Sequence, residues 1–124
     1  MSDILKGVDG HFDPTGTDQH APGAKMDGGK PLAGLLLDFG LALEAVAELG
    51  TFGAKKYSRG GWQSVPDGIQ RYEDAMMRHM LKVRTEKIDP ETNLPHLYAV
   101  AWNALALLEL AIRERDERRT GESQ

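Results

Sequence analysis

The sequence predicts an all-α fold, a helical bundle that assembles as an oligomer. Three long segments carry apolar residues at the spacing of an α-helix, and Gly- and Pro-rich stretches separate them. No segment alternates apolar and polar residues as a β-strand does. The 124 residues suit one small domain, which we place at 31–119, between an N-terminal arm at 1–30 and a tail at 120–124.

The N-terminal arm contains Gly, Pro, Asp and His without periodicity, which predicts a loop that is partly disordered in the free protein. Its Gly-rich stretch at 23–30 is not a Walker A motif, because Pro31 stands where that motif has the Ser or Thr that holds Mg²⁺. Lys25 and Lys30 on this stretch can still fold over phosphate groups. An ordinary linker is the alternative.

The first helix is expected at 38–57, on apolar residues that recur at helical spacing: Phe39, Leu43, Val46 and Leu49. Glu44 and Glu48 lie one turn apart on one face, so both can reach a common metal ion; a solvated face is the alternative. Lys55 and Lys56 close the helix and can bind phosphate. Trp62 follows two glycines in the next connection, where it can stack on a base or fill the core.

The second helix is expected at 67–84, with an apolar stripe of Ile69, Tyr72, Met76, Met80 and Val83. Glu73 lies within this stripe, where a buried carboxylate needs a cation or a metal ion as its partner. The alternatives are a basic side chain such as Arg71 or Lys82 that reaches it, or a stripe edge exposed to water. Asp74 points about 100° away from Glu73, so only one of the two is expected to bind a metal directly. Asp74 can instead pair with Arg78 four residues later. For His79, the sequence allows either a core residue or a ligand-binding residue.

The third helix is expected at 93–118, after a turn at Asp89-Pro90, with Thr92 or Asn93 as its cap and Pro95 in its first turn. Asp89 and Glu91 can have no function other than to form this turn or cap the helix. The inward stripe of the helix reads His96, Val100, Asn103, Leu107 and Leu110. A histidine on such a stripe is either a satisfied core residue or a site residue.

The third helix is also apolar nearly all round from Leu97 to Leu110. A helix of this kind must be buried on more than one side, which one chain of this length cannot do well. We therefore expect a homodimer or homotetramer, with the third helix near the interface.

Composition excludes several function classes. The formal charge is 15 − 19 = −4, which argues against stable nucleic-acid binding, although a compact anionic substrate remains possible if a metal supplies positive charge. The chain has no cysteine, which excludes disulfides and thiolate chemistry. No apolar run is long enough to cross a membrane, and the N-terminus lacks a signal-peptide pattern. A cytoplasmic setting is expected, which is the host cytoplasm if a phage encodes the protein.

An ordered set of short motifs covers about residues 23–110. The set comprises Gly29-Lys30-Pro31, Leu43-Glu44-Ala45-Val46-Ala47, Phe52-Gly53-Ala54-Lys55-Lys56-Tyr57, Trp62, Arg71-Tyr72-x-Asp74-Ala75, Arg78-His79, Asp89-Pro90-Glu91-Thr92, Leu94-Pro95-His96-Leu97 and Asn103-Ala104-Leu105. Together these motifs resemble the phage MazG-like dATP/dGTP diphosphohydrolases of the MazZ type, within the all-α NTP pyrophosphatase superfamily. The order of the motifs is specific, although each one alone is weak.

The resemblance implies a fold of the MazG and dimeric dUTPase type, with Mg²⁺ or Mn²⁺ as cofactor. It implies hydrolysis of a purine deoxynucleoside triphosphate to the monophosphate and pyrophosphate, which in some phages supplies a 2-aminoadenine DNA pathway. The positions that match the family pattern are Glu44, Asp74, Arg78, His79, Asp89, His96 and Asn103.

Residues and resemblance together lead to one main hypothesis, a metal-dependent nucleotide pyrophosphohydrolase. Its catalytic residues are Glu44, Glu48 and Asp74, and its metal ligands are Glu44 and Glu48 with Glu73 or Asp74. Its substrate-binding residues are Lys30, Lys55, Lys56, Trp62, Arg78, His79, His96 and Asn103. The rival hypothesis is a non-enzymatic helical dimerisation or adaptor protein. The sequence does not fix the base among guanine, adenine and diaminopurine.

Overall fold

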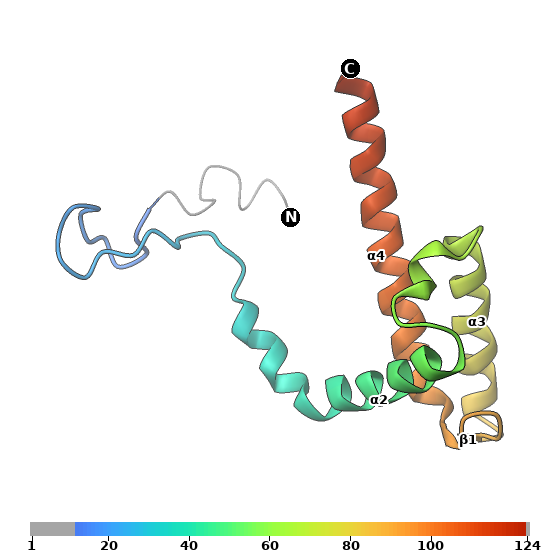
Figure 1. Cartoon of the computed structure of the whole chain (residues 1–124). Helices are drawn as coiled ribbons and strands as arrows, with labels where there is room; N and C mark the ends of the chain where they lie inside the picture. The colour runs from blue at the N-terminus through green and yellow to red at the C-terminus, as the bar shows by residue number, and fades with distance from the viewer. Residues whose placement is uncertain (1–11, 124) are drawn as a thin grey trace. The chain divides into compact units, whose positions relative to one another are not determined.

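The chain is mainly helical in the computed structural model, which describes residues 12–123 (Figure 1). Its elements are the 3-10 helix η1 (Ala33–Phe39), α2 (Gly40–Lys56), the 3-10 helix η2 (Gly61–Ser64), α3 (Gly68–Val83), β1 (Ile88–Asp89), β2 (Leu94–Pro95) and α4 (His96–Ser123). The all-α prediction is confirmed, and the three expected helices correspond to α2, α3 and α4. The chain divides into two compact units, an N-terminal unit and a helical unit, with the boundary in the sequence between Asp38 and Phe39.

Helix α4 is the centre of the helical unit. Helix α3 lies alongside α4, and α2 also packs against α4 (Figure 1). The buried residues of α4 are His96, Ala99, Asn103 and Ala106, whose spacings of three and four residues place them on one face. The predicted inward placement of His96 and Asn103 is thus confirmed. Two of the four residues are alanines, which leave room for the neighbouring helices to approach closely.

The contact between α2 and α4 depends on a glycine. A Cβ atom at Gly50 would lie 2.5 Å from Cζ3 of Trp102, well inside van der Waals contact. The Gly50→Ala variant is therefore expected to lose about 1–3 kcal/mol of unfolding free energy by overpacking, partly offset by the better helix propensity of Ala. Gly53→Ala on the same helix is the matched control, because nothing lies within 4 Å of its Cβ position. Urea unfolding at equal protein concentration measures the unfolding free energy of both variants. If Gly50→Ala is as stable as Gly53→Ala, the close contact between Gly50 and Trp102 is not present.

The connection between α3 and α4 differs from the prediction. The sequence predicts no strand, but Ile88 pairs with Pro95 and Asp89 with Leu94 in a short antiparallel pair. Helix α4 consequently begins at His96 rather than at 93. The Oγ1 of Thr92 accepts the N–H of Leu94 at 3.1 Å, so Thr92 shapes the turn and does not cap the helix. Two-residue strands are too short to show an alternating pattern in the sequence.

The buried face of α3 also differs from the predicted apolar stripe. Ile69, Tyr72, Met76 and Val83 are partly buried, as predicted, and His79 joins them. Glu73 and Met80 are exposed. Of the alternatives for Glu73, the exposed edge of the stripe is the one observed, because the partly buried residues of α3 follow the line of 72, 76, 79 and 83. Glu73 lies to one side of that line.

Residues 12–28 of the N-terminal unit form a series of turns around Asp13. Its carboxylate accepts the N–H and Oγ1–H of Thr15 at 2.7 and 2.6 Å, and the N–H of Lys25 at 2.8 Å. These hydrogen bonds, that of the Thr15 side chain first, hold the pKa of Asp13 below its usual range. Gly28 packs on the ring of Phe12, where a Cβ atom would come within 2.4 Å. Residues 12–28 thus have a specific turn structure of their own, while residues 1–11 lie outside the described part.

Among residues 12–123, no helix is long and apolar enough to cross a membrane.

Candidate functional site

A large cleft opens in the helical unit between the second half of α2, the connection containing η2, and α3. Its volume is about 1250 Å³, and Trp102 and Asn103 of α4 form part of its wall. Small-molecule sites typically measure about 300–1,000 Å³, so a nucleotide has room here. The predicted site residues that line the cleft are Lys55, Trp62, Asp74, Arg78 and Asn103. The fold therefore brings together residues that are up to 48 positions apart in the sequence (103 − 55 = 48).

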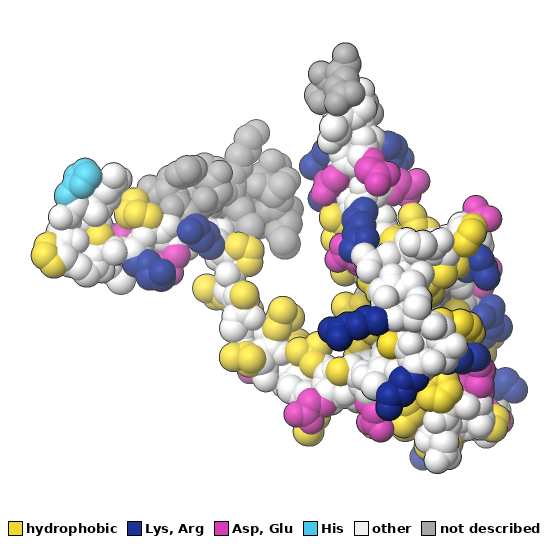
Figure 2. All heavy atoms as spheres, in the orientation of Figure 1, with side chains coloured by type: hydrophobic (Ala, Val, Ile, Leu, Met, Phe, Trp, Pro, Cys, Tyr) yellow, Lys and Arg dark blue, Asp and Glu magenta, His cyan; other side chains and the backbone are white. Residues whose placement is uncertain are grey.

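The cleft is strongly cationic although the chain is acidic. Its charged lining comprises Lys55, Arg59, Arg71, Arg78 and Asp74, a balance of 4 − 1 = +3, against −4 for the whole chain. Figure 2 shows Lys and Arg side chains on the face of the helical unit where α2 ends and the connection to α3 begins. Cations gathered in a concave site attract and concentrate anionic ligands.

Three of these cations are available to a ligand. Lys55, Arg59 and Arg78 make no hydrogen bond or ion pair with any residue in the described part of the chain, whereas Arg71 donates to the carbonyl of Pro66 at 3.2 Å. The alternative of an Asp74–Arg78 ion pair is not observed. Asp74 instead accepts a long hydrogen bond of 3.4 Å from Nε2 of Gln70.

Trp62 both packs and lines the cleft. Its ring meets those of Tyr72 and Trp102 edge to face, with centroids 6.4 and 6.2 Å apart. The hydroxyl of Tyr72 donates to the carbonyl of Trp62 at 2.8 Å, and the guanidinium of Arg113 lies over the Trp62 ring. These contacts fix the orientation of an aromatic wall, which can present a face to a planar base.

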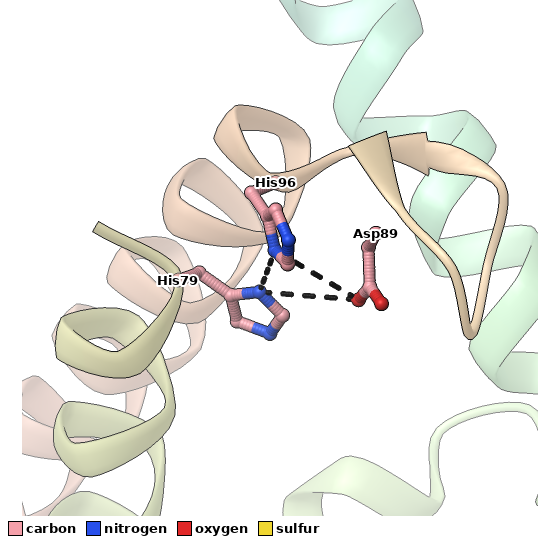
Figure 3. A group of neighbouring side chains, drawn as sticks. All are labelled: His79, Asp89 and His96. Carbon is pink, nitrogen blue, oxygen red and sulfur yellow. Dashed lines mark hydrogen bonds and ion pairs between the residues drawn. The ribbon is translucent and has the colours of Figure 1, made fainter. Parts of the chain in front are cut away.

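A second group of site residues lies at the junction of α3, β1 and α4 (Figure 3). His79 Nδ1 and His96 Nδ1 are 2.8 Å apart, and each lies 4.0 Å from Oδ2 of Asp89. His96 and Asp89 are only 4% and 8% exposed. These three side chains are a group that can hold a metal ion in the described part of the chain. We call this group the His/Asp cluster.

Burial sets the electrostatics of the His/Asp cluster. Desolvation lowers the pKa of His79, and the Asp89 carboxylate opposes that shift. The net lowering favours the neutral imidazole, whose free nitrogen lone pair can bind a metal. Nε2 of His96 lies 2.9 Å from Oε1 of Glu86, and because a carboxylate only accepts, that nitrogen carries the proton.

The His/Asp cluster adjoins the cleft. A smaller hollow of about 160 Å³ is lined by Lys56, His79, Asp89 and Glu91, and Asn103 lines both this hollow and the large cleft. The Nδ2 of Asn103 donates to the carbonyl of Ala99 at 2.7 Å, which leaves its Oδ1 for other partners. Lys56 forms an ion pair with Glu91 at the rim.

The remaining predicted residues lie elsewhere. Glu44 and Glu48 are exposed on α2, and Glu73 is exposed on α3; none of them lines either hollow. Lys30 is exposed in the N-terminal unit. The sequence assigns no site role to Arg59, Arg71 and Trp102 of the cleft. It leaves Asp89 between a turn residue and a position that matches the family pattern, and it does not predict that Asp89 lies beside the two histidines. Besides its match to the family pattern, Asp89 lies between two histidines in the sequence, ten residues after His79 and seven before His96.

One family model matches most of the chain. Residues 20–119 match the family model described as dATP/dGTP diphosphohydrolase, N-terminal, which covers far more than half of the chain. No curated protein and no solved structure matches the chain.

Proposed function

Because the chain belongs to the dATP/dGTP diphosphohydrolase family, a family of nucleotide pyrophosphohydrolase enzymes, we propose that it hydrolyses purine deoxynucleoside triphosphates to the monophosphate and pyrophosphate with Mg²⁺ or Mn²⁺. The observation that carries the proposal is the cationic cleft with an aromatic wall in an acidic chain. The resemblance further supports the proposal that the activity supplies purine monophosphate to a 2-aminoadenine DNA pathway, as in some phages.

The unpaired cations bind the triphosphate. Lys55, Arg59 and Arg78 line one cleft and make no hydrogen bond or ion pair with other described residues, so a triphosphate meets donors that need not leave protein partners first. Guanidinium groups match phosphate oxygens in two-point hydrogen bonds. Water attacks the α-phosphorus, the bond from that phosphorus to the bridging oxygen breaks, and pyrophosphate leaves. The cations stabilise the negative charge that develops on this leaving group.

Asp74 is our proposed protein ligand for the divalent ion in the cleft. It is exposed there, and its only described hydrogen bond is the long one from Gln70, so a carboxylate oxygen is available. Mg²⁺ commonly binds through one or two carboxylates plus substrate phosphates, which suits a single acid among cations. When bound, the ion supplies charge neutralisation and a water molecule of lowered pKa. Glu44 and Glu48 do not line the cleft. They remain proposed as the further carboxylates because they lie one turn apart on α2 and because Glu44 matches the family pattern, with Glu48 orienting the attacking water.

The nucleoside is proposed to lie against Trp62, with Asn103 as a hydrogen-bonding partner. A rigid indole offers a stacking surface to any purine, so stacking supplies affinity and not base choice. Asn103 lines both hollows, and because its Nδ2 is hydrogen-bonded to the carbonyl of Ala99, its Oδ1 remains as the acceptor for a ligand.

The functional test measures products from a panel of deoxynucleoside triphosphates. We expect pyrophosphate and monophosphate in equal amounts from dATP or dGTP, faster than from dCTP or dTTP, and none after chelation of divalent ions. Ion-exchange chromatography separates these products from those of stepwise phosphate removal. Absence of pyrophosphate with every nucleotide, in Mg²⁺ and in Mn²⁺, supports the adaptor hypothesis and rejects the enzyme.

The exposed face of α4 supports an oligomer. Leu97, Leu105, Leu108 and Ile112 are 58%, 49%, 57% and 38% exposed, and at 100° per residue they lie on the side of α4 opposite its buried stripe. We expect light scattering to give the mass of a dimer or tetramer. Leu108→Glu, which introduces a charge in the middle of this face, is expected to lower that mass. A wild-type monomer at micromolar concentration contradicts the proposal.

A further inference from the structure

The His/Asp cluster brings three ligand atoms from three separate elements to one point. His79 is on α3, Asp89 on β1 and His96 at the start of α4, and their facing atoms are 2.8 to 4.0 Å apart. Two ligands held about 2.1 Å from one ion are separated by roughly 3.0–3.4 Å in octahedral or tetrahedral geometry. The observed separations bracket this range, so small side-chain movements admit an ion.

The outer hydrogen bonds aim these atoms inward. The bond to Glu86 places the His96 proton on Nε2, so in the neutral ring the lone pair of Nδ1 points at His79. Oδ1 of Asp89 accepts the N–H of Glu91 at 2.9 Å, which leaves Oδ2 toward the two rings. Resident metal sites in proteins have this arrangement, in which a carboxylate holds the second nitrogen of a ligating histidine.

Asp89 indicates that the His/Asp cluster binds a ligand and is not only part of the packed core. Its Oδ2 receives no hydrogen bond from the described residues, because both histidine nitrogens are 4.0 Å away. The Oδ1 of this mostly buried carboxylate has a donor in the N–H of Glu91, so Oδ2 is the oxygen left for a ligand. Asp89 also borders a hollow with room for an ion and a few water molecules. The simpler alternative is a pair of histidines that share one proton between their Nδ1 atoms.

The donor set selects the class of ion. Mg²⁺, Ca²⁺ and Mn²⁺ prefer oxygen ligands, whereas imidazole nitrogen suits Zn²⁺, Fe²⁺, Ni²⁺ and Cu²⁺. We propose that His79, Asp89 and His96 form a resident site for one transition-metal ion, separate from the divalent ion that accompanies the nucleotide, with Glu86 as the residue that positions His96. This site rests on its own geometry and does not require the proposed function.

Cobalt binding to the metal-free full-length chain tests the site, because Co²⁺ bound by nitrogen gives visible absorption bands. We expect one Co²⁺ per chain by calorimetry and by the visible spectrum, without nucleotide, and at least 100-fold tighter than Mg²⁺. His79→Ala and Asp89→Asn are expected to abolish the bands. Glu86→Ala is expected to weaken binding about 10-fold or more, as for other residues that orient metal ligands.

Two controls separate this site from the cleft and from misfolding. His20→Ala removes an exposed histidine of the N-terminal unit, and Asp74→Asn removes the carboxylate of the cleft; both are expected to bind Co²⁺ like the wild type. Circular dichroism of the metal-free variants checks their helicity. His79 is the less buried of the two histidines, with a side chain 24% exposed, so its variant is the safer test. Absence of stoichiometric Co²⁺ binding, or binding that only Asp74→Asn reduces, overturns the site and leaves a proton-sharing histidine pair.

Discussion

Asp74→Asn is expected to lose most of the deoxynucleoside triphosphate hydrolysis, whereas Glu73→Gln is expected to stay within about two-fold of the wild type. Asp74 lines the cationic cleft and Glu73 does not. Adjacent helical residues differ in direction by about 100°, so the two carboxylates cannot serve one site equally. Loss of a metal-binding carboxylate removes stabilisation of the developing phosphate charge, an effect of about 10²–10³-fold for comparable electrostatic groups.

The pair is a matched comparison because both residues are exposed acids on the same helix, and both substitutions replace a carboxylate by its amide. Stability should therefore change little in either variant. Steady-state kinetics at several Mn²⁺ concentrations provides the measurement, and the Asp74 variant should also need more Mn²⁺ for half-maximal rate. The opposite order of activities would show that Glu73 is the ligand and that the cleft is not where the metal–nucleotide complex binds.

The helices were predictable because their signal is local and long. Helix α3 repeats apolar residues over four turns, and its predicted range of 67–84 differs from the observed Gly68–Val83 by one residue at each end. The strands at Ile88–Asp89 and Leu94–Pro95 were not predictable in this way. Each is too short for a pattern, and their pairing follows from the turn at 89–93, where Asn93 adopts a positive φ of 60°.

The site was predictable only in part, because it depends on contacts between distant segments. Periodicity gave the inward direction of His96 and Asn103 correctly. It placed Glu73 in a stripe, but the line of contact with α4 runs beside that residue. Arg59 looks like an ordinary surface residue in the sequence, and Arg71 belongs to a motif without a role of its own; only the fold places both in one cleft. The position of Asp89 next to His79 likewise depends on the antiparallel pairing of β1 and β2, which the sequence does not reveal.

Arg78→Ala is the second substitution for which a large effect is expected. Arg78 lies in the cleft, makes no hydrogen bond or ion pair with the other described residues, and is one turn from Asp74 on α3. A guanidinium in this position can bind a phosphate oxygen that gains charge as pyrophosphate leaves. Its loss is expected to lower kcat/KM for the deoxynucleoside triphosphate about 100-fold, which corresponds to about 2.7 kcal/mol of transition-state stabilisation.

Two further variants show whether charge or geometry produces this effect. Arg78→Lys keeps the charge but loses the two-point hydrogen bond, so an intermediate rate is expected. Arg84→Ala removes an exposed arginine at the end of α3 that does not line the cleft, and it should leave kcat/KM unchanged. If Arg78→Ala lowers only the association rate, and lowers it less at high salt, Arg78 contributes long-range attraction alone. A loss in kcat that persists at high salt places the guanidinium on the reacting phosphates, because contacts at hydrogen-bond distance are screened far less than a field across the cleft.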